Sequence, residues 1–152
     1  MPEGAVYVGR PSRWGNPFGV TDWFVYGTFV DGYTDWDIDY LTPEAARAAS
    51  VDMFSDLVRG FFDPTKFDTL SDAKFRLMYE QRTQWITRIG GHPTEMARHE
   101  LRGKDLVCWC PLISRGEYVP CHSDVLLSVA NDLSIDEVVR ENHRRAAWEA
   151  LR

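Results

Sequence analysis

Long apolar runs are absent from this sequence of 152 residues. No stretch approaches the roughly 20 apolar residues that a membrane-spanning helix needs, which argues against an integral membrane protein and against a membrane partner. The opening residues also lack the basic segment and apolar core of a secretory signal. We therefore expect a cytoplasmic protein.

An excess of positive charge is missing as well. The formal net charge is −6, from 17 Lys and Arg against 23 Asp and Glu. Neutralising the phosphates of a nucleic acid requires a basic surface, so we expect no nonspecific coating of nucleic acid. A pocket that holds a single nucleotide is compatible with this charge.

Cysteine is scarce, and its three residues lie close together as Cys108, Cys110 and Cys121, the last followed directly by His122. Without a sign of export, a disulfide framework is not expected. A cluster of thiols beside an imidazole indicates either a reactive site or a metal site.

Apolar periodicity, caps and breakers predict the elements along the chain. Short apolar runs indicate strands over 5–8 and 106–110, and alternating aromatics suggest a hairpin within 20–41. Residues 9–19, which we call the N-terminal loop, and residues 111–120 are expected to be irregular. Predicted helices cover 43–62, 71–89, 94–101, 123–131 and a last segment that opens with the capping box Ser134 to Glu137.

The first of these helices is expected to bury one face. The apolar residues that recur on it at three- and four-residue spacing are Ala46, Ala49, Met53, Leu57, Val58 and Phe61.

This order of elements predicts a single α/β domain over 1–152, of Rossmann-like architecture, with a small, mostly parallel sheet and an aromatic-rich insertion. If the two strands are parallel neighbours, the N-terminal loop and residues 108–124, which we call the cysteine corner, leave the sheet at the same edge. Open α/β proteins bind ligands at that edge.

Three interpretations of the cysteines stay open. The first is a zinc site formed by Cys108, Cys110, Cys121 and His122, whose donor types fit zinc although their spacing is unlike paired C-x-x-C motifs and adjacent ligands strain a tetrahedron. The second is a catalytic site, in which Cys121 at a helix N-terminus has His122 and Asp124 in support. The third is that Cys108 and Cys110 are ordinary core residues.

The N-terminal loop combines arginines, an amide and a tryptophan, which suit a phosphate or carboxylate and a stacked base. The alternative is a structural loop packed by its own aromatics. Together with one thiol of the cysteine corner, the candidate substrate-binding residues are Gly9, Arg10, Ser12, Arg13, Trp14, Asn16 and Cys110.

Two motifs, Gly9-Arg-Pro-Ser-Arg-Trp-Gly-Asn-Pro-Phe18 and the Cys-Trp-Cys with its later Cys-His, resemble a small uncharacterised family of phages and bacteria. The corner is more loosely similar to a second uncharacterised family of α/β proteins. Residues 20–100 have no counterpart in the first resemblance and are expected to include an insertion that is atypical of the family. The resemblance implies a bacterial or phage-infected host cell and no established activity. Association with phage genes suggests nucleotide or nucleic-acid metabolism.

These observations lead to two hypotheses for function. The first is an enzyme, a hydrolase or transferase that acts on a nucleotide, nucleoside or modified nucleobase through glycosidic-bond or group-transfer chemistry. The second is a non-catalytic module, with or without a stabilising zinc ion, that binds a nucleotide-like ligand or a protein partner. The cofactor is left open, with zinc as the candidate.

Overall fold

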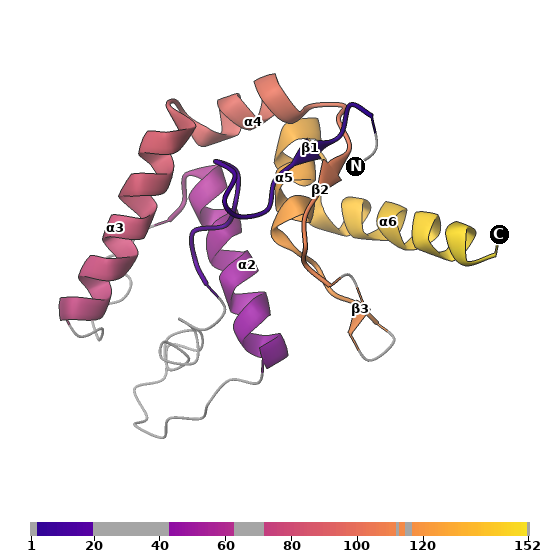
Figure 1. The fold of residues 1–152 in the computed structure, drawn as a ribbon, viewed down its shortest axis with the longest axis horizontal. Coiled ribbons are helices and arrows are strands. Elements are labelled where there is room, and N and C mark those ends of the chain that lie inside the picture. The colour runs from indigo at the N-terminus through magenta and orange to yellow at the C-terminus, as the bar shows by residue number, and fades with distance from the viewer. Residues whose placement is uncertain (1–2, 20–42, 63–71, 112, 115–116, 152) are drawn as a thin grey trace.

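The computed structural model describes residues 3–19, 43–62, 72–111, 113–114 and 117–151. Within these residues the protein is mixed α and β and mostly helical, as Figure 1 shows. The hairpin predicted within 20–41 lies outside the described residues.

Strands β1 (Val6–Tyr7) and β2 (Leu106–Val107) lie side by side and pair in parallel, with Val6 opposite Leu106. The parallel pairing predicted from the sequence is confirmed. The pair is shorter than predicted, because residues 108–110 leave the ladder and turn two thiols toward the start of a helix. A two-stranded parallel sheet is an α/β arrangement but is far smaller than the sheet of a Rossmann domain.

A second, antiparallel sheet follows in the segment that was expected to be irregular. Strand β3 (Ile113–Ser114) pairs with β4 (Glu117–Tyr118). The sequence prediction of a plain loop over 111–120 was therefore wrong. Two-residue strands give too short a pattern of alternation to be recognised.

The five helices within the described residues follow the predicted order: α2 (Pro43–Arg59), α3 (Asp72–Ile89), α4 (Pro93–Leu101), α5 (His122–Asn131) and α6 (Ile135–Ala150). The capping box before α6 is present, since Glu137 accepts from the backbone N–H of Ser134 at 2.7 Å and Ser134 Oγ accepts from that of Glu137 at 3.1 Å. Helix α5 is the centre of the packing, because it contacts α2, α4, α6 and β2.

The end of α2 differs from the prediction at Phe61, whose side chain is 69% exposed. Gly60 adopts a left-handed φ of +81°, which stops the helix and turns Phe61 out of the buried face. Phe62 is buried instead and stacks on Phe18 with ring centroids 5.5 Å apart. This contact joins α2 to the N-terminal loop.

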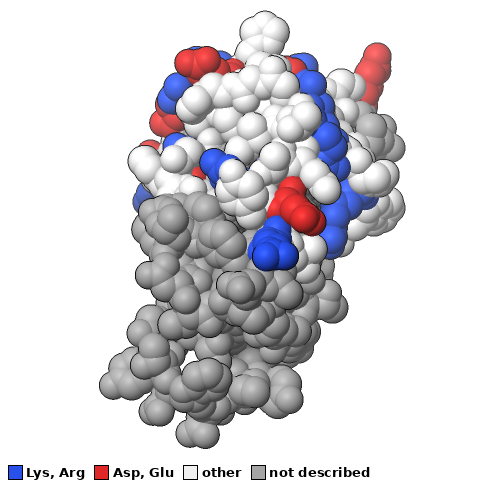
Figure 2. All heavy atoms as spheres, turned by 90° about the vertical axis from the view of Figure 1, so that its left-hand side faces the viewer, with Lys and Arg blue, Asp and Glu red and all other residues white. Residues whose placement is uncertain are grey.

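The surface on the side of α3 carries a narrow band of Lys and Arg side chains beside uncharged surface (Figure 2).

No helix among the described residues is both long and apolar enough to cross a membrane.

Candidate functional site

A cavity of about 640 Å³ lies where the two parallel strands end. Gly9 and Arg10 line it from the segment after β1, and Trp109 and Cys110 line it from the segment after β2. The N-terminal loop and the cysteine corner therefore meet, as the parallel pairing predicted. The volume lies in the range of small-molecule sites.

Helix α2 forms a third wall that sequence reasoning missed. It contributes Glu44, Arg47, Ser50 and Val51 to the lining. Arg47 is half-buried, and its Nη2 atom is buried without a hydrogen-bond partner among the described residues. A lone arginine in an alanine-rich stretch was the signal available in the sequence.

The start of the N-terminal loop is built tightly around Gly9. A Cβ atom at this position would lie 2.5 Å from Tyr7 Oη, so a larger residue would displace the tyrosine. Tyr7 Oη donates to the carbonyl of Arg10 at 2.9 Å. These contacts hold the backbone that presents Arg10 at the cavity.

Two of the predicted ligand-binding residues face α4 instead of the cavity. Trp14 is 3% exposed, and its Nε1–H donates to Glu100 at 3.2 Å. Arg13 forms an ion pair with the same carboxylate. Neither belongs to the described lining, so the structure does not bring them to the ligand space.

Asn16 lines the cavity and also fastens the loop to α2. Its Nδ2 donates to Ser50 Oγ at 2.9 Å, and its Oδ1 accepts from the backbone N–H of Phe18 at 2.9 Å. Its amide is therefore engaged within the fold. Ser12 lies outside the described lining, and its hydroxyl is buried without a partner among the described residues.

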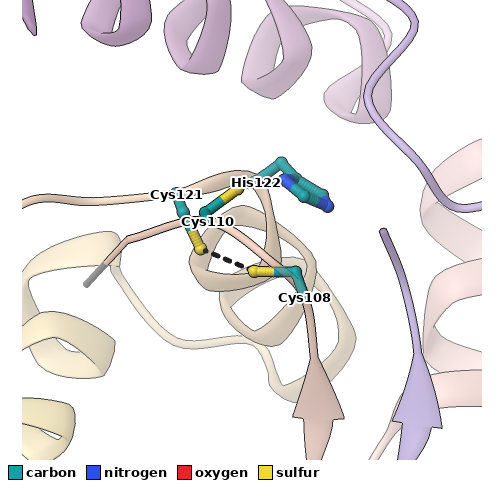
Figure 3. Close-up of side chains that lie close together, drawn as sticks. All are labelled: Cys108, Cys110, Cys121 and His122. Atoms are coloured by element: carbon teal, nitrogen blue, oxygen red, sulfur yellow. Dashed lines mark hydrogen bonds between the residues drawn. The ribbon is translucent and has the colours of Figure 1, made fainter. Parts of the chain in front are cut away.

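The four donors of the cysteine corner converge at the start of α5 (Figure 3). One sulfur or nitrogen atom from each of Cys108, Cys110, Cys121 and His122 lies within 4.8 Å of all the others. The sulfur atoms of Cys108 and Cys121 are 3.5 Å apart, and Cys110 Sγ is 3.4 Å from His122 Nδ1.

The imidazole of His122 is held in one orientation. Its Nε2 lies 2.9 Å from the carbonyl oxygen of Val8, which accepts only, so Nε2 carries the proton when the ring is neutral. The lone pair is then on Nδ1, which faces Cys110. The backbone that ends β1 thereby sets the direction of the donor atom.

Asp124 has a structural role in this geometry. It is 1% exposed and accepts from the backbone N–H of Cys121 at 2.8 Å, from Tyr118 Oη at 2.7 Å and from Asn142 Nδ2 at 2.8 Å. It therefore caps α5 and joins it to β4 and α6. The contribution of Tyr118 and Asn142 was not foreseen, because nothing local in the sequence links them to Asp124.

The predicted catalytic group is arranged differently from a nucleophile and base pair. Cys121 is fully buried, and its sulfur lies 2.7 Å from Ser123 Oγ. Among the described contacts, the imidazole of His122 meets Cys110 and not Cys121. Cys110 and His122 line the cavity, whereas catalysis by Cys121 stays a prediction.

The thiols perturb one another. Hydrogen bonds from the thiols of Cys110 and Cys121 lower the pKa of Cys108 below its ordinary value. The hydrogen bond to Cys108 raises the pKa of Cys110, and the hydrogen bonds to both other thiols, followed by burial, raise that of Cys121. The three thiols therefore form one hydrogen-bonded group of sulfur donors, a type that suits a soft, tetrahedral metal ion.

The chain matches, over residues 1–132, the model of a family described as Domain of unknown function (DUF4326). The chain belongs to this family. The DUF4326 match confirms the resemblance to an uncharacterised family, and its range includes residues 20–100, for which the motifs alone had no counterpart. No curated protein and no solved structure matches the chain.

Proposed function

We propose that the protein binds a nucleotide or nucleoside in the cavity between β1, β2 and α2. The observation that carries this proposal is the buried, unpartnered Nη2 of Arg47 beside that cavity. Leaving a buried polar group unpaired costs free energy. Because Nη2 has almost no accessible surface in this structure, the guanidinium would turn toward the cavity to meet a ligand oxygen. Guanidinium groups bind phosphate by charge-assisted hydrogen bonds, and Arg10 supplies a second one at the same cavity.

The shape and lining of the cavity suit a base beside the anionic group. Trp109 lines the cavity and is 88% exposed, so a face of its indole is available for stacking, which contributes about 1–3 kcal/mol per base. Phe18, Val51 and Val119 add apolar walls. Trp109 thus takes the stacking role expected of Trp14.

The place of the cavity supports the same proposal. It lies beyond the carboxyl ends of two parallel strands, where open α/β proteins hold their ligands. As part of the proposal, we take the strand pair and its cavity to correspond to the ligand-binding edge of a Rossmann-like domain.

The second candidate is an enzyme that breaks a glycosidic bond or transfers a group of the bound nucleotide. It is favoured by the 3.4 Å contact between Cys110 Sγ and His122 Nδ1, both of which line the cavity. An imidazole lone pair beside a thiol can take the thiol proton and so generate a thiolate nucleophile. This transfer has to overcome the hydrogen bond with Cys108, which raises the pKa of Cys110. In this candidate Cys110, the thiol at the cavity, is the reactive one.

Isothermal titration of a panel of nucleosides and nucleoside 5′-monophosphates tests the binding. Replacing Arg47 by Ala should weaken a bound monophosphate by about 1.5–3 kcal/mol, the value of a hydrogen bond to a charged group. Arg88→Ala is the matched control, since Arg88 is exposed on α3 and outside the described lining. Equal affinity of the Arg47 variant and the wild type, or a panel without any binder, would contradict the proposal.

Chromatography of the same mixtures after incubation tests the enzyme. Release of free base or a transferred product by the wild type, lost in Cys110→Ala while monophosphate binding persists, would support the second candidate. A wild type that binds monophosphate without turning it over would leave binding as the function.

A further inference from the structure

We infer that Cys108, Cys110, Cys121 and His122 bind one zinc ion, which fastens the end of β2 to the start of α5. This inference is independent of the proposed function, because it rests on the donor set and not on the cavity.

Two of the six donor–donor distances are close to those that zinc requires, and all six are within 4.8 Å. Zn–S and Zn–N bonds of about 2.3 and 2.0–2.1 Å in a tetrahedron place two sulfurs about 3.8 Å apart and a sulfur and a nitrogen about 3.5 Å apart. The corner has Cys108 and Cys121 sulfurs 3.5 Å apart and Cys110 Sγ 3.4 Å from His122 Nδ1. Small shifts of side chains complete the tetrahedron.

Adjacent ligands in the sequence are accommodated by the start of α5. Cys121 is the N-cap with extended backbone, φ −130° and ψ 175°, whereas His122 is the first helical residue. This change of backbone conformation between neighbours lets both side chains reach the same point (Figure 3). The strain expected from the spacing alone is thereby avoided.

The surroundings of the donors are those of a metal site. Zinc-bound histidines commonly donate their other ring N–H to a carbonyl, as His122 Nε2 does to Val8 at 2.9 Å. Ser123 Oγ lies 2.7 Å from Cys121 Sγ and 3.7 Å from Cys108 Sγ. Its hydroxyl is therefore placed to donate a hydrogen bond to a metal-bound sulfur. The N-terminus of α5 adds its dipole, which favours thiolates.

The site is structural in type, because four protein ligands leave no open position for a substrate. The ion would link the segment after β2 to the start of α5. In a larger sheet, additional strand pairing would provide that link. It would also fix Cys110 and His122 in the cavity wall. With all three thiols bound to metal, no free thiol nucleophile remains, so a zinc-loaded protein favours the binding function over the thiol-based enzyme.

Elemental analysis of protein purified under reducing conditions in unsupplemented buffer tests the inference. We expect about one zinc per chain, as in a closed four-ligand site, falling to near zero in His122→Asn. His99→Asn is the matched control, since His99 is exposed on α4, and it should keep its zinc. Loss of zinc from both variants alike would overturn the assignment of His122.

A measurement on the wild type keeps the test decisive if His122→Asn fails to fold. Refolding the chelated wild type with Co²⁺ should give the strong visible bands of a tetrahedral ion and the near-ultraviolet bands of cobalt–thiolate bonds. Metal-free protein with three titratable thiols, a disulfide between Cys108 and Cys121 shown by a mass two hydrogens lower, or iron in place of zinc would each overturn the inference.

Discussion

The N-terminal loop and the cysteine corner border the same cavity but differ in which of their predicted functional side chains reach it. In the loop, Trp14 and Arg13 turn away from the cavity and bind Glu100 on α4. In the corner, Cys110 and His122 turn toward one another and line the cavity. A residue suited to a ligand contacts one only when the fold leaves its bonding groups available.

The two tryptophans of these segments show the same contrast. Trp14 is 3% exposed and packs edge-on against Trp85 with ring centroids 6.4 Å apart, whereas Trp109 is 88% exposed. One indole belongs to the core and the other to the cavity. Substitutions in the two segments should therefore affect different properties.

The largest expected difference is in stability between Trp14→Ala and Trp109→Ala. Removing Trp14 leaves a cavity in the core and should lower the free energy of unfolding by about 3–5 kcal/mol. Removing the exposed Trp109 should change it by no more than about 0.5 kcal/mol. Equilibrium urea denaturation measures the free energy of unfolding of both variants. Similar losses would contradict the assignment of Trp14 to the core and of Trp109 to the exposed surface.

A smaller effect is expected in the corner at alkaline pH. Burial, followed by the hydrogen bond to Asp124, raises the pKa of Tyr118 above its ordinary value. Because the folded protein holds this proton more tightly than the unfolded chain, the contribution to stability is complete below pH about 10 and is lost as the pH rises further.

Stability of wild type and Tyr118→Phe, measured by urea denaturation at pH 9 and 11, tests this. The wild type should lose more stability than the variant over that interval, because the variant has no phenol at 118 to titrate. Equal losses would mean that the Tyr118 pKa is the same in both states.

The smallest effect is expected for Arg13→Ala. The Arg13–Glu100 pair is partly exposed, with 41% and 25% of the two side chains accessible, and such pairs contribute about 0.2–1 kcal/mol. Monophosphate affinity should be unchanged, in contrast to Arg47→Ala. Weaker ligand binding by the Arg13 variant in the same titration would return Arg13 to the ligand-binding role that the composition of the loop suggested.

Local features of the fold were predictable because they depend on neighbours in the sequence. Periodic apolar residues and breakers marked α2 to α6 to within a few residues, and the Ser134–Glu137 box marked the start of α6. The end of α2 was misjudged at Phe61, since the left-handed Gly60 changes which of two adjacent phenylalanines is buried.

The candidate site was predictable only in part. The two chemically rich segments and the four sulfur and imidazole donors were identified from composition and spacing. Arg47 was not, because its one local signal, a lone arginine in an alanine-rich stretch, does not say that the helix forms a cavity wall. The bonding of Asp124 to Tyr118 and Asn142 likewise depends on how α5, β4 and α6 pack.

By itself, the sequence determined the order of the helices and the set of soft donors near residue 121, because these follow from short-range pattern and residue chemistry. Only the tertiary structure decided which donors converge, which tryptophan stays exposed and which arginine is left with a buried, unpaired nitrogen. The physical reason is that a polar side chain pairs with groups that are near it in space, and these are often far from it in the chain. Trp14 and Glu100 are such a pair.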